Sequence, residues 1–345
     1  MKLLSRRGVV ASIAIACAVA PPAFALDPAL VEAARKEGTV VWYSGLIANQ
    51  IIRPVTEGFE AKYPGIKLQG TRMSSSEAAL KIMNESRAGK LQADVFDNTA
   101  LAFRLMAAGL VENYKPEAAQ SFPAARKEAN GAWTALNVYV MTAAYNTEMV
   151  AAKDVPKTLT DLLDPKWKGR IAWTNDPTTA GPPGFIGVQL TSMGQQAGMD
   201  FLKRLAQQNI VNVPASQRVV LDQVIAGQYP LALMTFDYHS VISANQGAPV
   251  QWLPIGPAAQ LPNPIGLMKN APHPNAAKLF LEYVLSPEGQ TVFRDANYLP
   301  ANPAVQPKDP KLLPEGGHFD SVLITPETTA AKLDEWTAIY NELFK

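Results

Sequence analysis

Segments with strand composition alternate with segments of helical spacing over the first third of the chain. Thr39–Tyr43 is a run of β-branched and aromatic residues, and Ala93–Phe96 is a second largely apolar run. Between them, the apolar residues of Ile51–Tyr63 recur at helical spacing. Such alternation is typical of α/β domains built on a largely parallel sheet. The pattern therefore predicts an α/β fold class before any motif is considered.

The same periodicities predict the remaining elements. We expect further strands at 66–68, 133–145, 171–173 and 231–235. We expect helices at 26–37, 100–108, 218–226, 274–285 and 328–344, two more within 185–208, and one that opens at 286–290. The stretch 155–169 has the composition of a linker.

The first 25 residues have the layout of a secretory signal peptide. A basic start, Lys2 to Arg7, precedes the apolar run Gly8–Ala20 and the small-residue site Ala23-Phe24-Ala25. The apolar run is shorter than the roughly 20 residues that a membrane-spanning helix needs, so a retained anchor is the weaker alternative. We expect cleavage near Ala25 and a mature protein outside the cytoplasm. Arg6-Arg7 leaves both the general secretory route and twin-arginine export open.

The composition of the mature chain limits its partners. Its size of about 320 residues predicts two domains. The only cysteine, Cys17, lies in the signal segment, so disulfides and thiolate metal sites are not expected. Lipid attachment at Cys17 is a weaker alternative, because Ala14-Ile15-Ala16 lacks the expected leucine. The mature chain is slightly acidic, and nothing in its charge indicates a nucleic-acid or membrane-surface partner.

Motifs of known catalytic chemistry are missing from the sequence. The three histidines, His239, His273 and His318, have no zinc-protease spacing, and no nucleophile elbow or P-loop is present. We therefore predict a protein that is not an enzyme and has no cofactor. The enzyme alternative rests only on Asp237 and His239, which would act as an acid–base pair.

Polar side chains follow three of the predicted strands of the first domain, where each strand leads into a helix. These loops are Tyr43-Ser44-Gly45, Arg72 to Ser76, and Asp97-Asn98-Thr99. Ligands of open α/β sheets bind outside the carboxyl ends of the strands, where helix N-termini favour anions. Arg72 beside Ser74, Ser75 and Ser76 has the groups to hold a carboxylate or a phosphate. The alternative is that the serines cap a helix and that Arg72 is a solvated surface charge.

A second polar cluster, Phe236-Asp237-Tyr238-His239, follows the predicted strand 231–235. Asp237 and Tyr238 together offer oxygen atoms to a hard cation, or hydrogen bonds to an organic ligand. The alternative is an ordinary helix cap at Asp237 with Tyr238 packed against the core.

Several motifs together resemble the ferric-iron-type extracellular solute-binding proteins of bacterial ABC transporters. No single motif is decisive, but their order and spacing cover essentially the whole mature chain. They are Thr39-Val-Val-Trp-Tyr-Ser, Ala93-Asp-Val-Phe, Tyr145-Asn-Thr, Leu159-Thr-Asp-Leu-Leu-Asp-Pro-Lys-Trp-Lys-Gly-Arg-Ile, Asp176-Pro, Gly227-Gln-Tyr-Pro-Leu-Ala, His273-Pro-Asn-Ala-Ala-Lys and Phe280-Leu-Glu-Tyr-Val-Leu-Ser-Pro-Glu-Gly-Gln.

The resemblance implies a two-lobed type II periplasmic binding protein fold with two hinge-crossing strands. Lobe 1 would comprise residues 26–137 and 256–315, and lobe 2 residues 138–255 and 316–345, with crossings near Leu136–Met141 and Trp252–Ile255. A solute held between the lobes would favour hinge closure, and the closed form would dock on the ABC permease. The resemblance also implies a periplasmic monomer. A sensory receptor that uses the same cleft stays open as a second role.

The resemblance leaves the solute undecided. Relatives that hold Fe(III) use two adjacent tyrosines, which match Asp237-Tyr238, so one tyrosine is replaced; the histidine position matches Ile47, which cannot ligate. The iron alternative would use Asp237, Tyr238 and Glu85, with Fe(III) as transported ligand. Receptors for phosphorylated sugars, phosphonates and carboxylates use serines and arginines instead, and this favours a small organic anion. The predicted ligand-binding set is Tyr43, Ser44, Arg72, Ser74, Ser75, Ser76, Asp97, Asn98, Thr178, Arg218, Asp237 and Tyr238.

Overall fold

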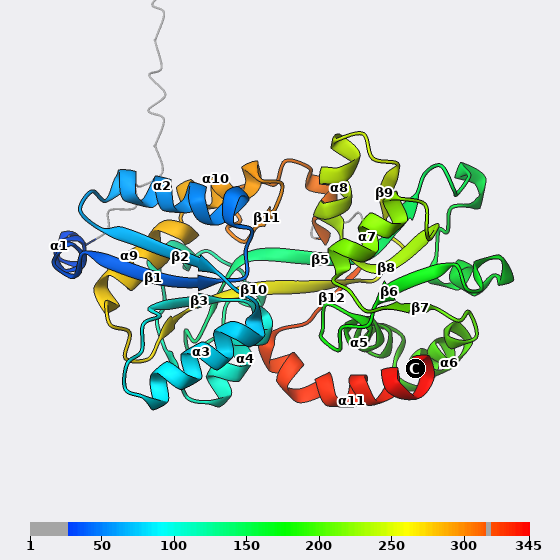
Figure 1. Cartoon of the computed structure of the whole chain (residues 1–345), viewed down its shortest axis with the longest axis horizontal. Coiled ribbons are helices and arrows are strands. Elements are labelled where there is room, and N and C mark those ends of the chain that lie inside the picture. The colour runs from blue at the N-terminus through cyan, green and yellow to red at the C-terminus, as the bar shows by residue number, and fades with distance from the viewer. Residues whose placement is uncertain (1–26, 315–318) are drawn as a thin grey trace, which may run out of the picture.

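The computed structural model describes residues 27–314 and 319–345. The predicted signal peptide, its cleavage site at Ala25 and Cys17 lie outside the described residues. Two α/β halves lie side by side, and two long strands run from one half into the other (Figure 1). No helix of the described residues is long and apolar enough to cross a membrane.

Lobe 1 is the half that contains the start of the described chain. Its helices are α1 (Pro28–Glu37), α2 (Arg53–Lys62), α3 (Ser75–Arg87), α4 (Thr99–Ala107), α9 (Pro274–Leu285) and α10 (Pro287–Asp295). Its strands are β1 (Thr39–Ser44), β2 (Lys67–Arg72), β3 (Val95–Asp97), β4 (Val111–Glu112) and β11 (Leu299–Pro300). A π-helical turn, Ala48–Ile52, leads into α2, and 3-10 turns lie at Glu117–Ala119 and Ala124–Arg126.

Lobe 2 is built from the middle of the chain and its end. Its helices are α5 (Pro182–Met193), α6 (Gln195–Ala206), α7 (Gln217–Ile225), α8 (Asp237–Asn245) and α11 (Pro326–Phe344). Its strands are β6 (Ile171–Thr174), β7 (Val211–Val213), β8 (Leu231–Phe236), β9 (Val250–Leu253) and β12 (Ser321–Leu323). The segment expected to be a linker forms 3-10 turns at Ala152–Asp154, Leu159–Leu163 and Pro165–Trp167, and a further turn lies at Pro310–Leu312.

Strands β5 (Thr134–Asn146) and β10 (Ala258–Met268) pair with each other in antiparallel fashion and connect the lobes. The strand order is β2-β1-β3-β10-β5-β8-β6-β7, and β4, β9, β11 and β12 pair at its sides. The blocks β2-β1-β3 and β8-β6-β7 are parallel, as predicted, but β10 runs antiparallel to β3, and β5 runs antiparallel to β10 and to β8. The sheet is therefore mixed, and the two-lobed α/β architecture is confirmed.

The second crossing lies in β10, so its expected place near Trp252–Ile255 is wrong. That stretch is a strand, β9, but it pairs with the lobe 2 end of β5, from Ala143 to Asn146. Leu253 and Ile255 pack in the core of lobe 2. The first crossing, near Leu136–Met141, lies within β5.

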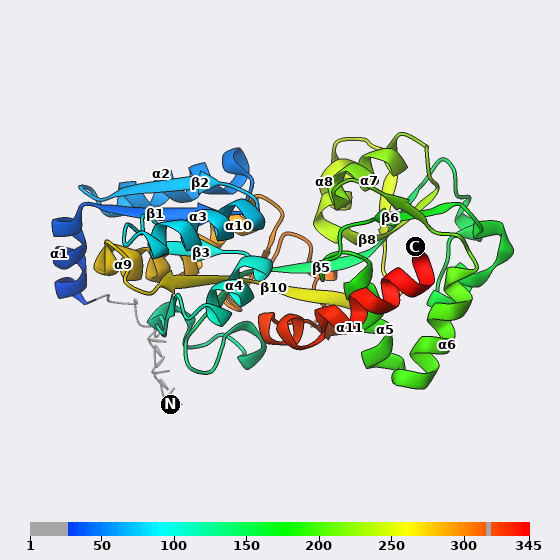
Figure 2. The ribbon, with the colours of Figure 1, turned by 60° about the horizontal axis from the view of Figure 1, so that its bottom comes forward.

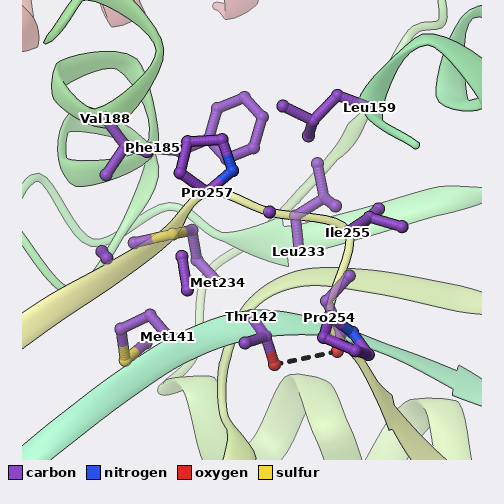
Figure 3. A pocket seen from close by; sticks show the side chains of 14 residues that line it. Met141, Thr142, Leu159, Phe185, Val188, Leu233, Met234, Pro254, Ile255 and Pro257 are labelled. Atoms are coloured by element: carbon purple, nitrogen blue, oxygen red, sulfur yellow. Dashed lines mark hydrogen bonds between the residues drawn. The ribbon is translucent and has the colours of Figure 1, made fainter. Parts of the chain in front are cut away.

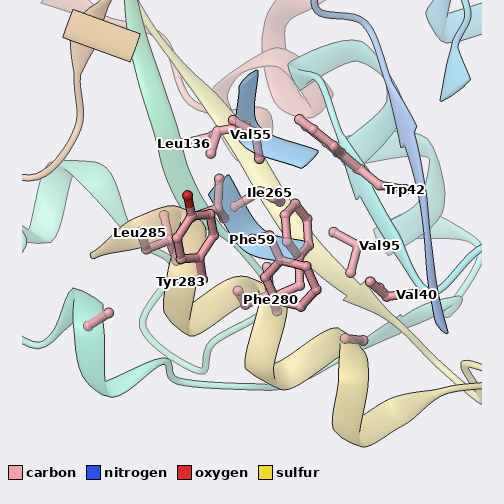
Figure 4. Packing of buried hydrophobic residues seen from close by; sticks show 14 of the residues in the cluster. Val40, Trp42, Val55, Phe59, Val95, Leu136, Ile265, Phe280, Tyr283 and Leu285 are labelled. Carbon is pink, nitrogen blue, oxygen red and sulfur yellow. The ribbon is translucent and has the colours of Figure 1, made fainter. Parts of the chain in front are cut away.

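The core of lobe 1 joins the N-terminal segments to segments that follow lobe 2 in the sequence (Figure 4). Phe280 of α9 lies with its ring centroid 5.3 Å from that of Trp42 of β1 and 5.5 Å from that of Phe59 of α2. All three side chains are fully buried. Burial of each such aromatic side chain contributes on the order of 2–3 kcal/mol. The packing therefore completes lobe 1 only when α9 returns to it after the chain has passed through lobe 2.

Candidate functional site

A large cavity of about 900 Å³ lies between the lobes. Lobe 1 lines it with Gly45, Leu46, Ile47, Gln50, Arg72, Met73, Ser74, Ser75, Glu77, Asn98 and Tyr298. Lobe 2 and strand β5 line it with Ser216, Gln217, Arg218, Phe236, Tyr238, His239, Ile242, Gln246 and Tyr139. The cleft is thus walled by the loops that follow β1, β2 and β3 and by the first turns of α7 and α8.

The wall from lobe 1 is built on the first turn of α3. Ser74 caps the helix: its side chain accepts from the backbone N–H of Glu77, whose carboxylate accepts from the backbone N–H of Ser74 at 2.8 Å. Ser74 therefore caps α3, as the alternative interpretation states, and it also lines the cleft. Arg72 ends β2 just before this cap and is exposed.

Arg72 is the uncompensated cation of this wall. None of the ion pairs within residues 27–314 and 319–345 involves its guanidinium. The adjacent N-terminus of α3 adds the partial positive charge of its free N–H groups. An anion that enters the cleft therefore meets a guanidinium and the hydroxyls of Ser74 and Ser75 on one side.

Asn98 ties this wall to the hinge. It caps α4, since its Oδ1 accepts from the backbone N–H of Ala100 at 2.9 Å, and it also accepts from the hydroxyl of Ser75 at 2.8 Å. Its backbone N–H donates to the carbonyl of Pro264 in β10 at 3.0 Å. Its φ of 106° lies in the region that L-residues rarely adopt, which asparagine tolerates better than most.

Lobe 2 presents Arg218 in the first turn of α7. This arginine is already engaged, with Nη1 donating to the hydroxyl of Ser243 at 3.0 Å and Nη2 donating to Asp222 Oδ1 at 2.7 Å. The carboxylate offsets much of its charge. The electrostatic attraction of the cleft for an anion is consequently centred on lobe 1.

Three tyrosines and Phe236 form the floor of the cleft. The rings of Tyr139 and Tyr238 stack with centroids 6.1 Å apart, and those of Tyr238 and Tyr298 lie 4.6 Å apart. Burial is the main reason that the pKa values of Tyr139 and Tyr238 lie well above 10, and it raises the pKa of Tyr298 to about 12 despite the nearby Arg72. The floor is therefore a neutral, hydrogen-bonding aromatic surface at neutral pH.

His239 adds a neutral imidazole to this floor. Burial, and then the nearby Arg218, lower its pKa to about 4. It is consequently uncharged at neutral pH, and Arg72 and Arg218 carry the positive charge of the cleft.

Six of the predicted ligand-binding residues line this cleft, and six do not. Arg72, Ser74, Ser75, Asn98, Arg218 and Tyr238 line it. The side chains of Tyr43, Ser44, Ser76, Asp97, Thr178 and Asp237 are not part of its lining. Those six fall into two groups of three.

Tyr43, Ser44 and Asp97 support the wall from behind. Tyr43 donates its hydroxyl to Glu85 Oε1 at 3.0 Å, and Ser44 Oγ accepts from the backbone N–H of Leu46 at 3.1 Å. Asp97 is buried and accepts from the backbone N–H of Gly45 at 3.1 Å. Burial raises the pKa of Asp97 to about 6, although Ser44 and Gly45 hydrogen-bond to the carboxylate. These groups shape the loop Gly45–Ile47, which does line the cleft.

Asp237, Ser76 and Thr178 face other surroundings. Asp237 is fully buried at the start of α8 and accepts from the backbone N–H of Tyr238 at 2.6 Å. Burial raises its pKa well above the usual value. Ser76 lies on the exposed side of α3, and Thr178 donates to Asp176 Oδ2 at 3.2 Å in the loop before α5.

The residues proposed for the iron alternative do not come together. Glu85 lies in the last turns of α3, where Lys81 Nζ lies 2.8 Å from its Oε1 and the backbone N–H of Gln92 donates to its Oε2 at 3.0 Å. No group of three or more histidine, cysteine, aspartate or glutamate side chains suited to a metal ion occurs in the described part of the chain. Tyr238 alone of the proposed metal set faces the cleft.

The predicted ligand-binding set omitted Tyr139 and Tyr298, and it omitted His239 although this residue belongs to the second polar cluster. Tyr139 lies in a strand that looked purely structural, and Tyr298 follows α10 in the segment returning from lobe 2. The signal that could have identified Tyr139 is its place in the long β-rich segment predicted to cross between the lobes. A strand that crosses between the lobes has side chains next to the cleft. Nothing local marks Tyr298.

A second, apolar cavity lies inside lobe 2 (Figure 3). Its volume is about 20 Å³, room for about one water molecule. Phe185, Leu159 and Leu233 line it with Met141 and Met234, and no charged side chain is among its lining residues. It is too small for an organic solute and has no charged lining group, so it is not a candidate for the solute site.

The fold and the cleft define a two-lobed solute-binding protein. The family model described as bacterial extracellular solute-binding protein matches residues 55–315. The chain belongs to this family of bacterial extracellular solute-binding proteins.

Known relatives cover most of the chain. An Fe(3+)-binding periplasmic protein of Serratia marcescens is 26% identical over 305 residues, which are 82% of this chain and 84% of that protein. Iron-bound HitA from Pseudomonas aeruginosa has a TM-score of 0.72 at 23% identity and covers 88% of this chain and 99% of its own. AfuA from Actinobacillus pleuropneumoniae, with fructose-6-phosphate bound, has a TM-score of 0.72 at 21% identity, with 89% and 98% covered. At these identities, the two structures show the fold alone.

Proposed function

We propose that this protein is the receptor of an ABC importer that captures a small organic anion, such as a carboxylate or a phosphorylated compound, and delivers it unaltered to the permease. The protein works in the periplasm as a monomer, after removal of the signal peptide near Ala25. The observation that carries the proposal is the unpaired Arg72 beside Ser74 and Ser75 at the N-terminus of α3. A guanidinium and hydroxyl groups are the donors that carboxylates and phosphates accept.

The remainder of the cleft suits a neutral, hydroxylated body. His239 is uncharged at neutral pH, and Tyr139, Tyr238 and Tyr298 keep their phenolic protons. The lining also includes Gln50, Gln217 and Gln246, whose amides both donate and accept. The ligand accordingly places its charged end on lobe 1 and its polar, uncharged end on lobe 2.

Mass spectrometry of the compound that co-purifies with the protein tests the proposal directly. Isothermal titration with that compound should show that Arg72→Ala weakens binding by about 100-fold, the loss of a charge-assisted contact. Arg87→Ala is the matched control, because Arg87 is an exposed arginine at the other end of α3. Unchanged affinity in Arg72→Ala, or chemical conversion of the compound, would contradict the proposal.

Ferric iron is the second candidate. It is supported by the three tyrosines of the floor and by the similarity to the Fe(3+)-binding protein of Serratia marcescens. Phenolate is a good Fe(III) ligand, but the raised pKa values of Tyr139, Tyr238 and Tyr298 oppose deprotonation in the unliganded cleft.

Colour separates the two candidates. Tyrosinate bound to Fe(III) absorbs visible light, so the iron hypothesis requires a coloured protein after addition of ferric citrate and loss of the band in Tyr238→Phe. We expect a colourless protein. Tyr145→Phe is the control, because Tyr145 lies outside the cleft. If the absorption band is present in Tyr145→Phe and absent from Tyr238→Phe, the iron hypothesis replaces our proposal.

A further inference from the structure

Helix α11 belongs to lobe 2 but reaches back to lobe 1. Its later turns are anchored in the core of lobe 2, where Trp336 and Tyr340 are buried. Trp336 packs so closely on α5 that a Cβ atom at Gly187 would lie 2.6 Å from its ring. The first turn of α11 instead lies beside α4 of lobe 1. In Figure 1 and Figure 2 the helix begins at the gap between the halves, close to the edge of lobe 1, and runs from there across lobe 2.

One charge-assisted hydrogen bond joins the lobes at this place. The indole N–H of Trp133 donates to Glu327 Oε1 at 2.7 Å. Trp133 is 3% exposed and packs in the core of lobe 1, one residue before β5 begins. Glu327 lies in the first turn of α11, where the helix dipole favours a carboxylate. Trp133 is therefore fixed by the core of lobe 1, and Glu327 is an exposed residue on a helix that is anchored in lobe 2.

This contact lies away from the ligand. No residue of α4 or α11, nor Trp133, is among those that line the cleft. In both views, α11 and α8 lie on opposite sides of the connecting strands β5 and β10 (Figure 1 and Figure 2). A rotation about these strands that brings the lobes together across the cleft must therefore separate them at α11.

We propose that the bond between Trp133 and Glu327 is a tether that holds the lobes open and is lost when the cleft closes. Trp133 and Glu327 are then positioning residues, which set the affinity for the solute without touching it. When a ligand binds to the closed state, part of its binding free energy is offset by the loss of this hydrogen bond. The tether thus weakens binding and favours release, whichever solute is carried.

Distance measurements on the ligand-free protein test the tether without knowledge of the solute. Because the mature chain has no cysteine, Glu57→Cys on α2 and Gln228→Cys after α7 allow spin labelling at two sites only. Both positions are exposed and lie outside the cleft lining. Pulsed electron paramagnetic resonance on this pair reports the distribution of distances between the lobes.

Trp133→Phe removes the donor but keeps an aromatic ring in the core, and Glu327→Ala removes the acceptor. We expect each to raise the ratio of closed to open molecules about tenfold, the effect of losing one hydrogen bond to a charged group. Glu327→Gln keeps an acceptor oxygen and should stay near the parent distribution. Glu335→Ala is the control, because Glu335 pairs only with Lys332 on the exposed side of the same helix.

Parent-like distance distributions in both Trp133→Phe and Glu327→Ala would overturn the proposal. A lower melting temperature without a change in the distances would show that the bond only stabilises the fold, and that result also contradicts the tether. Equal shifts in Glu335→Ala and Glu327→Ala would do the same, because they would trace the effect to the charge of α11.

Discussion

The hydroxyl of Ser75 donates to Asn98 Oδ1 at 2.8 Å and thereby joins the first turns of two helices that meet at the cleft. The same oxygen of Asn98 caps α4, and the backbone of Asn98 is bonded to Pro264 in the connecting strand β10. A ligand that contacts Ser75 is thus two hydrogen bonds away from the hinge. If a bound anion draws this hydroxyl away from Asn98, the hydrogen-bond chain from Ser75 to β10 is broken, and β10 is one of the two strands that connect the lobes.

Substitutions at Asn98 separate its cap from its unusual backbone. Asn98→Ala should lower the free energy of unfolding by about 1–2 kcal/mol, because it removes the oxygen that caps α4 while the backbone stays at φ 106°, which is unfavourable for alanine as it is for asparagine. Asn98→Gly should cost less than about 1 kcal/mol, since glycine adopts this φ freely and is itself an acceptable N-cap. Urea unfolding of both variants measures the difference. Equal losses would mean that the backbone conformation carries no strain.

His239 should make the fold sensitive to mild acid. Its pKa is about 4 in the folded protein and about 6.5 in the unfolded chain, so the unfolded state takes up the proton first as the pH falls. The stability contributed by the neutral imidazole is present above pH 6.5 and is lost as the pH falls toward 4, by about 3 kcal/mol. Unfolding measured from pH 7.5 to 4.5 should show a smaller loss in His239→Gln. Parallel curves for the two proteins would contradict the buried, neutral state.

Asp97 should show the opposite dependence. Its pKa of about 6 in the folded protein lies above the unfolded value of 3.8, so the folded protein binds the proton more tightly. The ionised carboxylate at neutral pH therefore lowers the free energy of unfolding. As the pH rises from 4 to 7, the free energy of unfolding of the parent should fall relative to Asp97→Asn by about 3 kcal/mol. The amide keeps an acceptor for the N–H of Gly45, so the variant should fold. A constant difference across this range would show that Asp97 does not titrate there.

Glu282 holds the loop after β4 against α9. Its carboxylate accepts from the hydroxyl of Tyr114 at 2.6 Å and from the backbone N–H groups of Glu117 and Ala118 at 2.9 Å. Glu282→Gln turns an NH2 group toward one of these donors and should cost about 2–3 kcal/mol. Glu288→Gln is the control, because Glu288 pairs with Lys62 at the exposed surface and should cost less than about 0.5 kcal/mol. Chemical denaturation of both variants checks the contrast.

The elements that the sequence predicted well are those with local signals. Helix α3 begins where Ser74 and Glu77 form their capping box, and α1 ends at Gly38 with φ 71°. Both features depend on residues that are three or four positions apart in the sequence, so they can be predicted without knowledge of tertiary contacts. The short strands β4, β11 and β12 exist only because they pair with β10 or β5, and nothing local marks them.

The candidate site was predictable only in part, for the same reason. Arg72 and Ser74 were found because strand ends and helix starts place polar groups at a sheet edge. Asp237 has the composition of a ligand, but its position at the start of α8 turns its carboxylate inward onto the backbone of Tyr238. Tyr298 reaches the cleft through the return of the chain from lobe 2, which local sequence cannot reveal.

The long return of the chain also bears on how the protein is made. Strands β1 to β3 leave the ribosome first, but β10 and Phe280 of α9, which complete their sheet and cover Trp42, come only after the whole of lobe 2. A nascent chain that ends before Ala258 exposes this apolar surface and cannot reach a stable lobe 1. The first lobe can therefore complete its sheet and its core only after the second lobe has been synthesised.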